Sequence, residues 1–298
     1  MPVKFDLHRL RLLRELSLRG TIAAVAEALN YSSASVSQQL KLLQREVGAT
    51  LLEPDGRGLR LTPQAHILVT HAEAILNRLE QAEADLARSR EEISGTVRVA
   101  AFQTAVLALF PPALTYLKEH HPLLRVEIVQ AESELARSGL LPRDFDLVVD
   151  EVYPGYPLAR SALLHQQLLF TDPMRLSESA HAPSHETLRA YADAPWVLEP
   201  EGSPAREWAV AACRAAGFEP DIQFESTDVV VHERLAGAGH VVAFLPDLLP
   251  PHPESNVHRR LLSPEHHRRV VVTTRAVAQT NPAIAAVQAA LREAAVPV

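Results

Sequence analysis

The N-terminal part of the chain has apolar positions at helical spacing, interrupted by a short polar break. Residues 21–46 read TIAAVAEALNYSSASVSQQLKLLQRE, which predicts an alanine-rich helix, a tight turn and a second helix. Asn30 suits the turn because asparagine tolerates a left-handed backbone, and Ser32 is suited to cap the second helix. Three apolar residues of that helix recur at intervals of four and three and predict its inward stripe: Val36, Leu40 and Leu43.

A second apolar pattern, with heptad spacing, follows Pro63. Pro63 is favoured in the first turn of a helix, and Thr62 is suited to the N-cap before it. The repeat continues to Ile93, and a helix of about 27 residues would be about 40 Å long. We expect it to pair with a second copy of the chain, although a helix lying on its own domain is the alternative. The stripe predicted to form the dimer contact is Leu68, Ala72, Ile75, Leu79, Ala82 and Leu86.

Residues 51–62, between these patterns, predict a short β-hairpin. Asp55-Gly56 is a strong turn signal, and leucines alternate back towards an apolar core after it. Arg57 and Arg60 fall on this hairpin, where a wing beside a pair of helices would meet the phosphates of a nucleic acid.

From residue 95 onwards, short apolar runs alternate with helical patterns. The order of the first five segments, beginning with a strand, predicts an α/β fold with a parallel sheet. We expect strands at 96–101, 124–129, 145–149, 166–171, 196–198, 221–225, 241–245 and 269–274. We expect helices at 104–120, 132–139, 184–191, 204–216, 228–237 and 282–294.

The second helix of the N-terminal pair is richer in small hydrogen-bonding residues than packing requires. Short side chains let a backbone approach phosphates, and glutamine can read base edges in a major groove. We therefore expect this helix to bind DNA, although an ordinary amphipathic hairpin with a polar face would share part of the pattern. The predicted contacts are Ser33, Ser35 and Gln38 with base edges, and Ser37, Lys41, Arg57 and Arg60 with phosphates.

Charge is distributed unevenly along the chain. Residues 1–62 hold nine Lys or Arg and six Asp or Glu, a net charge of +3, whereas the remaining 236 residues have a net charge of −10. A basic head on an acidic body suits a nucleic-acid contact confined to one end. The length of 298 residues allows two or three domains. No apolar run approaches a membrane span and the N-terminus lacks a signal core, so we expect a cytoplasmic protein without membrane contact.

A set of positions in the helices and the hairpin carries a family likeness: Leu10, Leu13, 24–29, Ser32, Val36, Ser37, Gln39, Leu40, Leu43, Gly48, Leu51, Leu52 and 61–63. At these positions the chain resembles the LysR-type bacterial transcriptional regulators, and the resemblance continues over nearly the whole chain. Leu52, Pro54 and Ala65 depart from the family pattern, in which an aromatic residue, an arginine and a glycine are usual. None of these departures lies in the second helix.

This resemblance implies a winged helix-turn-helix DNA-binding domain at 1–62, a linker and dimerisation helix at 63–93, and a two-lobed α/β effector domain like a periplasmic binding protein. The first lobe would comprise 94–164 and 266–298, and the second lobe 165–265. The resemblance further implies a homodimer or homotetramer that binds double-stranded promoter DNA, responds to a small-molecule effector between the lobes and communicates with RNA polymerase. No cofactor is expected.

Polar turns at the ends of the predicted strands are candidates for effector binding. In open α/β sheets, ligands bind beyond the carboxyl ends of the strands, and the helix after the first strand has N-terminal amides that would suit a carboxylate. Two turns of the second lobe, 199–203 and 225–228, would face the same cleft, although several of these residues also suit helix capping. The predicted effector contacts are Gln103, Thr104, Ser203, Thr227 and Arg206, the last to balance an acidic group.

An α/β enzyme, and a regulator controlled by a protein partner with no small effector, are the competing interpretations. The 14 histidines invite a metal site, but Pro183 separates His181 from His185, and the His-rich segment 252–267 lacks acidic ligands at metal spacing. The chain has no Gly-x-Ser-x-Gly elbow, phosphate loop or dinucleotide motif. The sequence therefore predicts neither a catalytic nor a metal site, and favours the DNA-binding regulator.

Overall fold

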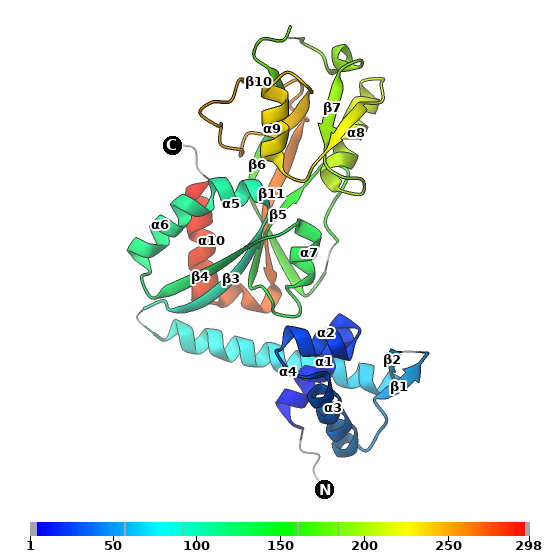
Figure 1. Cartoon of the computed structure of the whole chain (residues 1–298). Helices are drawn as coiled ribbons and strands as arrows, with labels where there is room; N and C mark the ends of the chain where they lie inside the picture. The colour runs from blue at the N-terminus through cyan, green and yellow to red at the C-terminus, as the bar shows by residue number, and fades with distance from the viewer. Residues whose placement is uncertain (1–4, 57, 91, 160, 184, 296–298) are drawn as a thin grey trace. The chain divides into compact units, whose positions relative to one another are not determined.

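The computed structural model describes residues 5–56, 58–90, 92–159, 161–183 and 185–295. The chain divides into two compact units, Met1–Ser89 and Arg90–Val298, which we call the head and the body (Figure 1). No helix in the described part of the chain is long and apolar enough to cross a membrane.

The head contains helices and one hairpin: α1 (Leu7–Arg19), α2 (Ile22–Ala28), α3 (Ser33–Val47), β1 (Leu52–Asp55), β2 (Gly58–Leu61) and α4 (Pro63–Arg88). The turn before α3 has Asn30 at φ 55°, and Ser32 Oγ accepts a hydrogen bond of 3.1 Å from the amide of Ser35. These observations confirm the predicted left-handed turn and N-cap. The predicted inward stripe is also confirmed, because Val36, Leu40 and Leu43 are buried in the core of the head.

The apolar stripe of α4 divides into two parts. Leu68 and Ala72 lie in the head's own core together with leucines of α1, so for this half of the stripe the helix lies on its own domain. Ile75, Leu79 and Leu86 are exposed further along, and Leu86 is 65% exposed. The helix ends at Arg88, so the predicted linker helix at 63–93 is shorter than expected.

The first lobe of the body is a sheet covered on both faces. Its elements are β3 (Gly95–Ala101), α5 (Gln103–Ala108), α6 (Phe110–His120), β4 (Leu124–Gln130), α7 (Ser133–Ser138), β5 (Leu147–Val152), the first half of β6 (Leu164–Ser179), β11 (His267–Arg275), η2 (Ala276–Thr280) and α10 (Pro282–Ala294). The strand order is β4-β3-β5-β11-β6. Alternate residues of β3 face opposite ways: Val97 and Val99 pack in the core with α6 and α10, whereas Ala100 packs in a smaller cluster with α7.

The second lobe contains η1 (Leu188–Tyr191), β7 (Pro195–Leu198), α8 (Pro204–Ala215), β8 (Asp221–Glu225), α9 (Val229–Gly237), β9 (Ala243–Pro246), β10 (Val257–Arg260) and the second half of β6. β6 pairs with β9 and β10, and β7 pairs in parallel with β8. Aromatic side chains fill its core, where the rings of Trp208 and Phe244 lie 5.0 Å apart.

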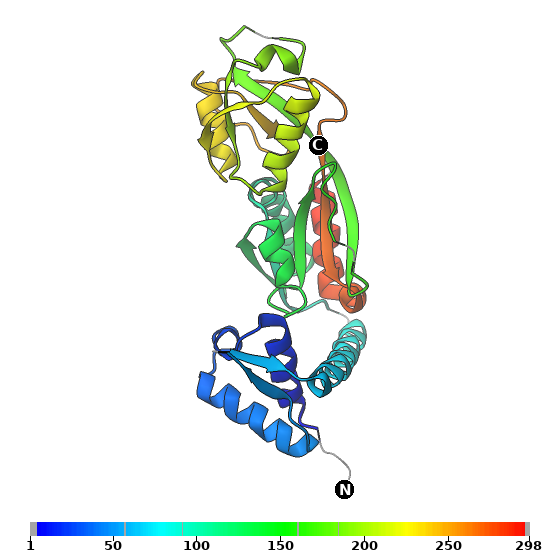
Figure 2. The same cartoon turned by 90° about the vertical axis from the view of Figure 1, so that its right-hand side faces the viewer.

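Two long strands, β6 and β11, connect the lobes (Figure 2). β6 pairs with β11 from Leu164 to Pro173 and then continues beside β9 from Met174. The first crossing therefore lies near Asp172, later in the chain than the expected boundary between residues 164 and 165. The strand predicted at 166–171 ended too early, because the backbone stays extended through Asp172 and Pro173.

Two other expected elements differ in the structure, and one strand was not expected. The helix predicted at 104–120 is two helices, α5 and α6, because Pro111 and Pro112 lack a backbone donor and are accommodated only in the first turn of α6. Of the helix predicted at 184–191, residue 184 lies outside the described residues, and residues 185–191 contribute only the short η1. The strand β10 was not predicted, because its residues VHRR are mostly polar.

A buried charge network fixes α4 to α1 within the head. The Arg14 side chain is 1% exposed, and its Nε donates to Glu73 Oε2 of α4 at 2.5 Å. Arg14 Nη1 also contacts Glu15 Oε1 at 2.9 Å, and Arg19 Nε contacts Glu15 Oε2 at 2.8 Å. Because removal of one partner leaves a buried charge without compensation, this network is sensitive to truncation.

We predict that Arg14→Ala destabilises the head by about 3–5 kcal/mol, because Glu73 loses its counter-charge and the buried Glu15 keeps only Arg19 among the described residues. Hydrogen exchange of the α1 amides in the full-length protein measures the effect. The control is Arg11→Ala, which removes an exposed arginine from the same helix. Equal exchange rates in both variants would contradict the role given to Arg14.

Candidate nucleic-acid interface and ligand cavity

One face of α3 carries polar side chains that the rest of the head does not use. Ser33, Gln38 and Lys41 are exposed, and Ser35 and Ser37 are half-buried. Within the described residues, the side chains of Ser33, Ser37, Gln38 and Lys41 make no hydrogen bond or ion pair. These groups are therefore available to a ligand outside the chain.

Other polar residues of α3 have structural roles. Gln39 Oε1 accepts a hydrogen bond of 2.9 Å from Arg9 Nε of α1. Gln44 Oε1 accepts from the amides of Leu51 and Leu52, at 2.8 and 3.0 Å, and so fixes the start of the hairpin. Two glutamines of α3, Gln39 and Gln44, thus stabilise the head, whereas Gln38 faces solvent.

Arg45 is a candidate DNA contact that the sequence interpretation missed. Ala34, Gln38, Lys41 and Arg45 are all exposed and recur at helical spacing, so they form one stripe along α3. Arg45 places a second cation on this stripe, one turn after Lys41. The helical spacing of Arg45 from Gln38 and Lys41 was the feature of the sequence that could have identified it.

One of the two hairpin arginines predicted to contact phosphates has a partner within the chain. Arg60 Nη2 lies 3.1 Å from Glu53 Oε2 on the opposite strand, and both side chains are exposed. Such an exposed ion pair is weak, so Arg60 can exchange its partner for a phosphate. Arg57 lies outside the described residues.

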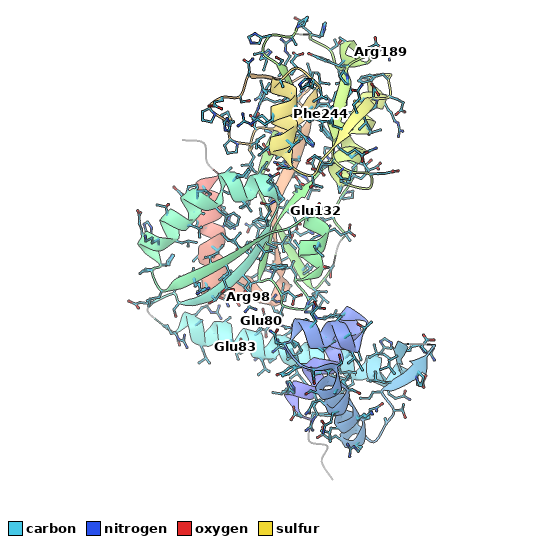
Figure 3. All side chains as sticks on the ribbon, viewed as in Figure 1. Glu80, Glu83, Arg98, Glu132, Arg189 and Phe244 are labelled. Atoms are coloured by element: carbon cyan, nitrogen blue, oxygen red, sulfur yellow. The ribbon has the colours of Figure 1, made fainter. Side chains whose placement is uncertain are left out.

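A cavity of about 500 Å³ lies between the two lobes of the body. The first lobe contributes residues after β3, β4 and β5, and the second lobe contributes the turn before α8, the start of α9 and part of β9. Figure 3 labels Glu132, before α7, and Phe244, on β9, which line it from opposite lobes. This position, at the carboxyl ends of the parallel strands, agrees with the site expected for an open α/β sheet.

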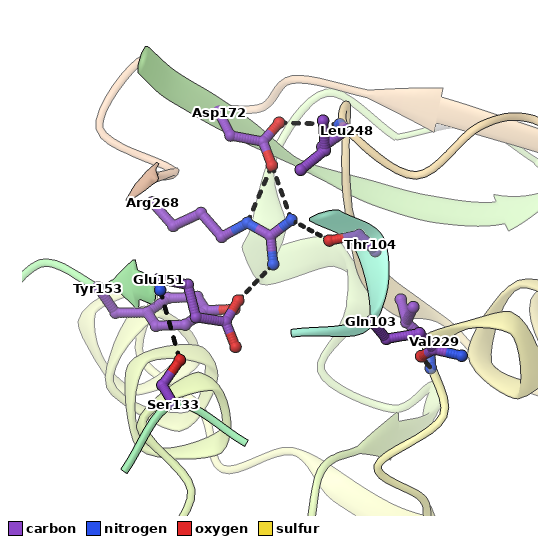
Figure 4. Close-up of polar contacts among 9 residues, drawn as sticks. All are labelled: Gln103, Thr104, Ser133, Glu151, Tyr153, Asp172, Val229, Leu248 and Arg268. Carbon is purple, nitrogen blue, oxygen red and sulfur yellow. Dashed lines mark hydrogen bonds and ion pairs between the residues drawn. The ribbon is translucent and has the colours of Figure 1, made fainter. Parts of the chain in front are cut away.

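A buried guanidinium occupies the edge of the cavity at the crossing strands (Figure 4). Arg268 on β11 is 4% exposed, and its Nε donates to Asp172 Oδ2 on β6 at 2.9 Å. Nη1 binds Glu151 at the end of β5, and Nη2 donates to Thr104 Oγ1 at 2.7 Å. The guanidinium also lies over the ring of Phe102, 4.9 Å from its centroid. Arg268 therefore joins the two crossing strands to β5 and α5 of the first lobe.

Gln103 and Thr104 line the cavity, as expected, but both side chains have partners within the chain. Gln103 Nε2 donates to Asp228 Oδ1 at 2.7 Å, and its Oε1 accepts from the amide of Val229 at 3.0 Å. This hydrogen bond to Asp228 is the main cause of the lowered pKa of that carboxyl. Gln103 thus connects α5 of the first lobe to α9 of the second.

The three second-lobe residues predicted to contact an effector are placed differently from one another. Ser203 and Thr227 line the cavity, and Ser203 also caps α8 by accepting from the amide of Arg206 at 3.1 Å. Arg206 does not line it. Its side chain binds Glu225 and the carbonyl of Glu199, because the end of β8 lies beside the first turn of α8.

Glu199 is an acidic residue of the cavity that the sequence interpretation passed over as part of a turn. Burial raises the pKa of its carboxyl to about 7, and the nearby carboxylates of Glu151 and Glu132 add to the rise. The Ser203 hydroxyl and the charge of Arg268 act in the opposite direction. The sequence could not signal this, since the three carboxylates come from separate turns.

No group of His, Cys, Asp and Glu side chains in the described ranges is arranged to hold a metal ion. His232 lines the cavity, and its Nε2 donates a hydrogen bond of 2.8 Å to the Ser226 carbonyl. Burial lowers the pKa of its imidazole.

A helix-turn-helix head and a two-lobed body with an interlobe cavity define a DNA-binding regulator with a ligand-binding module. The family model "Bacterial regulatory helix-turn-helix protein, lysR family" matches residues 7–66, and the model "LysR substrate binding domain" matches residues 90–296. The chain therefore belongs to the LysR family of transcriptional regulators. This assignment identifies it as a DNA-binding transcriptional regulator and not an enzyme.

Individual relatives are distant but similar over most of their length. The chain is 24% identical over 246 residues to the transcriptional dual regulator GltC of Bacillus subtilis, covering 81% of each chain. Full-length OxyR from Pseudomonas aeruginosa has a TM-score of 0.71 at 21% identity, over 97% of this chain and 95% of that one. The LysR regulator CbnR has a TM-score of 0.56 at 20% identity, over 96% of this chain and 100% of the CbnR chain. These structures confirm the predicted fold class.

We predict that Glu199 makes stability depend on pH. Its folded pKa of about 7 lies above the ordinary value of 4.5, so the folded state holds this proton more tightly, and stability is lost as the pH rises between these values. The free energy of unfolding of Glu199→Gln should therefore exceed that of the wild type by roughly 2–3 kcal/mol at about pH 8, and the two should differ little below about pH 5.

Thermal unfolding of both proteins across this pH range measures the difference. The control is Glu186→Gln, an exposed carboxyl of the same lobe outside the cavity. A Glu199→Gln curve parallel to that of the wild type would show that Glu199 ionises like an ordinary surface carboxyl.

Proposed function

We propose that the protein acts as a homodimer, or a pair of dimers, at promoter DNA in the cytoplasm under the control of a small effector. The supporting observation is the combination, in one chain, of an unpaired polar face on α3 and a cavity of about 500 Å³ between two lobes. A regulator controlled only by a protein partner would not need an internal cavity of this size. The cavity thus favours the small effector.

In this proposal α3 enters the major groove. Ser33, Ser35 and Gln38 read base edges, and Ser37 and Lys41 hold phosphates together with Arg57 and Arg60 on the hairpin. The exposure of Ser33, Gln38 and Lys41 supports these roles, and Arg45 extends the set. The structural relative CbnR, with a TM-score of 0.55 at 19% identity, has been solved in complex with its target DNA.

The exposed half of the α4 stripe forms the proposed dimer contact. Ile75, Leu79, Ala82 and Leu86 are exposed, whereas Leu68 and Ala72 are already buried in the head. Pairing two such helices would remove apolar surface from water and bring two copies of α3 to two half-sites of an inverted repeat. The dimer contact therefore requires the second half of the stripe only.

Effector control would operate through the contacts that span the lobes. A ligand in the cavity touches both lobes, and Gln103 already bridges them at 2.7 Å from Asp228. A ligand with different affinities for two lobe arrangements shifts the balance between them. We propose that this shift reaches the head through α4 and alters DNA bending and the access of RNA polymerase.

We predict that Gln38→Ala relaxes sequence preference and weakens binding to the preferred site by about 1–3 kcal/mol, because a base-edge contact is lost. Selection of bound sequences from a random DNA pool gives the preference of each variant. Gln279→Ala, which removes an exposed glutamine from the body, serves as the control. An unchanged set of selected sequences would refute base reading by Gln38.

We predict that the double variant Leu79→Glu, Leu86→Glu is monomeric and binds the selected DNA at least about tenfold more weakly, because paired half-site binding is lost. Analytical ultracentrifugation gives the oligomeric state. Gln81→Glu adds a charge to the opposite side of α4 and should leave the dimer intact. A dimeric double variant would exclude this stripe as the contact.

A further inference from the structure

The interlobe cavity has an excess of negative charge. Among the residues that line it, the acidic side chains are Glu132, Glu134, Glu151, Glu199 and Glu201. Among the described residues, the arginines or lysines in that lining are Arg137 and Arg268. A neutral or anionic ligand would leave this excess uncompensated in a partly enclosed space, where charges interact more strongly than in water.

Both arginines are already neutralised by carboxylates of the chain. Arg268 binds Asp172 and Glu151, and Arg137 Nη1 lies 3.1 Å from Asp150 Oδ1. All three guanidinium nitrogens of Arg268 are bound, so a carboxylate ligand would have to displace a buried partner there, which costs the desolvation of the displaced charge. Arg268 is therefore a poor site for an anion, and the charge of Arg137 is already balanced by Asp150.

Most of the lining carboxylates, in contrast, have no cationic partner. Within the described parts of the chain, no Lys or Arg forms an ion pair with Glu132, Glu134, Glu199 or Glu201. Glu199 is the most enclosed of them, and its nearest charged neighbours include the like-charged Glu151 and Glu132. A positive group placed among these carboxylates would relieve their repulsion.

The side chains of Gln103 and Thr104, which the sequence suggested as effector contacts, are already bound within the chain. Gln103 is bound to Asp228 and Val229, and Thr104 Oγ1 accepts from Arg268. His232 has its Nε2 on the Ser226 carbonyl, so its other ring nitrogen is left as an acceptor when the ring is neutral. The remaining hydroxyls, such as that of Thr227, suit either sign of charge.

Aromatic faces complete the lining. Phe102, Tyr153, Tyr156, Trp208 and Phe244 all border the cavity. Ring faces attract cations, and Arg268 over Phe102 is an example within the same site. The carboxylates are too dispersed to hold one metal ion in the described residues, which favours an extended organic cation over a metal ion.

We propose that the effector cavity takes a small organic cation, an amine or guanidine with an apolar or aromatic body, rather than the carboxylate that the helix N-terminus suggested. The ammonium lies among Glu132, Glu151 and Glu199, and the body of the ligand lies against Trp208 and Phe244. This ligand class rests on the proposed effector control, because it names the chemistry of that same cavity.

Size-matched probes of opposite charge test the ligand class on the full-length protein. Cadaverine is compared with glutarate, and phenethylamine with phenylacetate, each at millimolar concentration near about pH 8. We expect the amines to raise the unfolding temperature by about 2–4 °C and the two anions to leave it unchanged. Calorimetric titration then gives the affinity of each amine.

Carboxylate variants locate the binding. Glu199→Gln and Glu132→Gln should each weaken amine binding at least about fivefold, whereas Glu186→Gln, outside the cavity, should not. Amine affinity should also fall towards pH 6, because Glu199 takes up a proton there among Glu151, Glu132, Arg268 and Ser203. The proposal would be overturned if only the anions stabilised the protein, or if no probe did. It would also be overturned if the amines bound Glu199→Gln and Glu132→Gln with unchanged affinity.

A DNA measurement separates failure of the ligand class from failure of effector control. If amines bind the cavity but leave the affinity of the protein for the selected DNA unchanged, the ligand class is supported and effector control by amines is refuted. Anions that bind the cavity and change DNA affinity would refute the ligand class and leave effector control standing.

Discussion

The body of the protein depends on a buried guanidinium that must be neutralised where two strands pass between the lobes. Arg268 and Asp172 face each other across β11 and β6, the strands that belong to both lobes. Glu151 and Thr104 add partners from the first lobe, and the amide of Leu248 holds the other oxygen of Asp172 at 2.9 Å. Loss of one partner would leave a buried charge, so the crossing is held in a defined geometry.

This constraint also shapes the ligand cavity. Because Arg268 is satisfied by carboxylates of its own chain, it supplies little attraction for an anionic ligand. The neighbouring Glu199 and Glu132 form no ion pair with a Lys or Arg among the described residues. The group that stabilises the crossing is therefore also the basis of the cationic ligand class that we propose.

The head shows a similar division between residues that stabilise the fold and residues that face outward. Gln39 and Gln44 are used by α1 and by the start of the hairpin, while Gln38 remains free on the exposed stripe. On α4 the same division separates Leu68, in the head core, from Leu86, which is exposed. In both helices the outward residues are the ones expected to meet a partner.

Local signals allowed much of the fold to be predicted from the sequence. The turn at Asn30, the cap at Ser32 and the final helix 282–294 depend on neighbours within a few residues, and each is confirmed. The family likeness supplied the two-lobed arrangement, which periodicity alone did not show.

The parts that could not be predicted depend on contacts distant in sequence. Asp172 lies in a polar segment that looked like a strand end, and only its pairing with Arg268 shows why the strand continues. Arg206 and Gln103 were predicted to face a ligand, but Glu225 and Asp228, which bind them, come from other turns. The residues predicted to contact DNA, effector and partner remain predictions, because they concern molecules outside the chain.

Footprinting of the full-length protein on the DNA upstream of its own gene tests the central claim most directly. The claim is that a dimer presents two copies of α3 to one promoter. It predicts a protected region with approximate two-fold symmetry, whose half-sites are about one helical turn of DNA, or a multiple of it, apart. Absence of protection at low salt, where phosphate contacts are strongest, on that DNA and across a genomic library would contradict it.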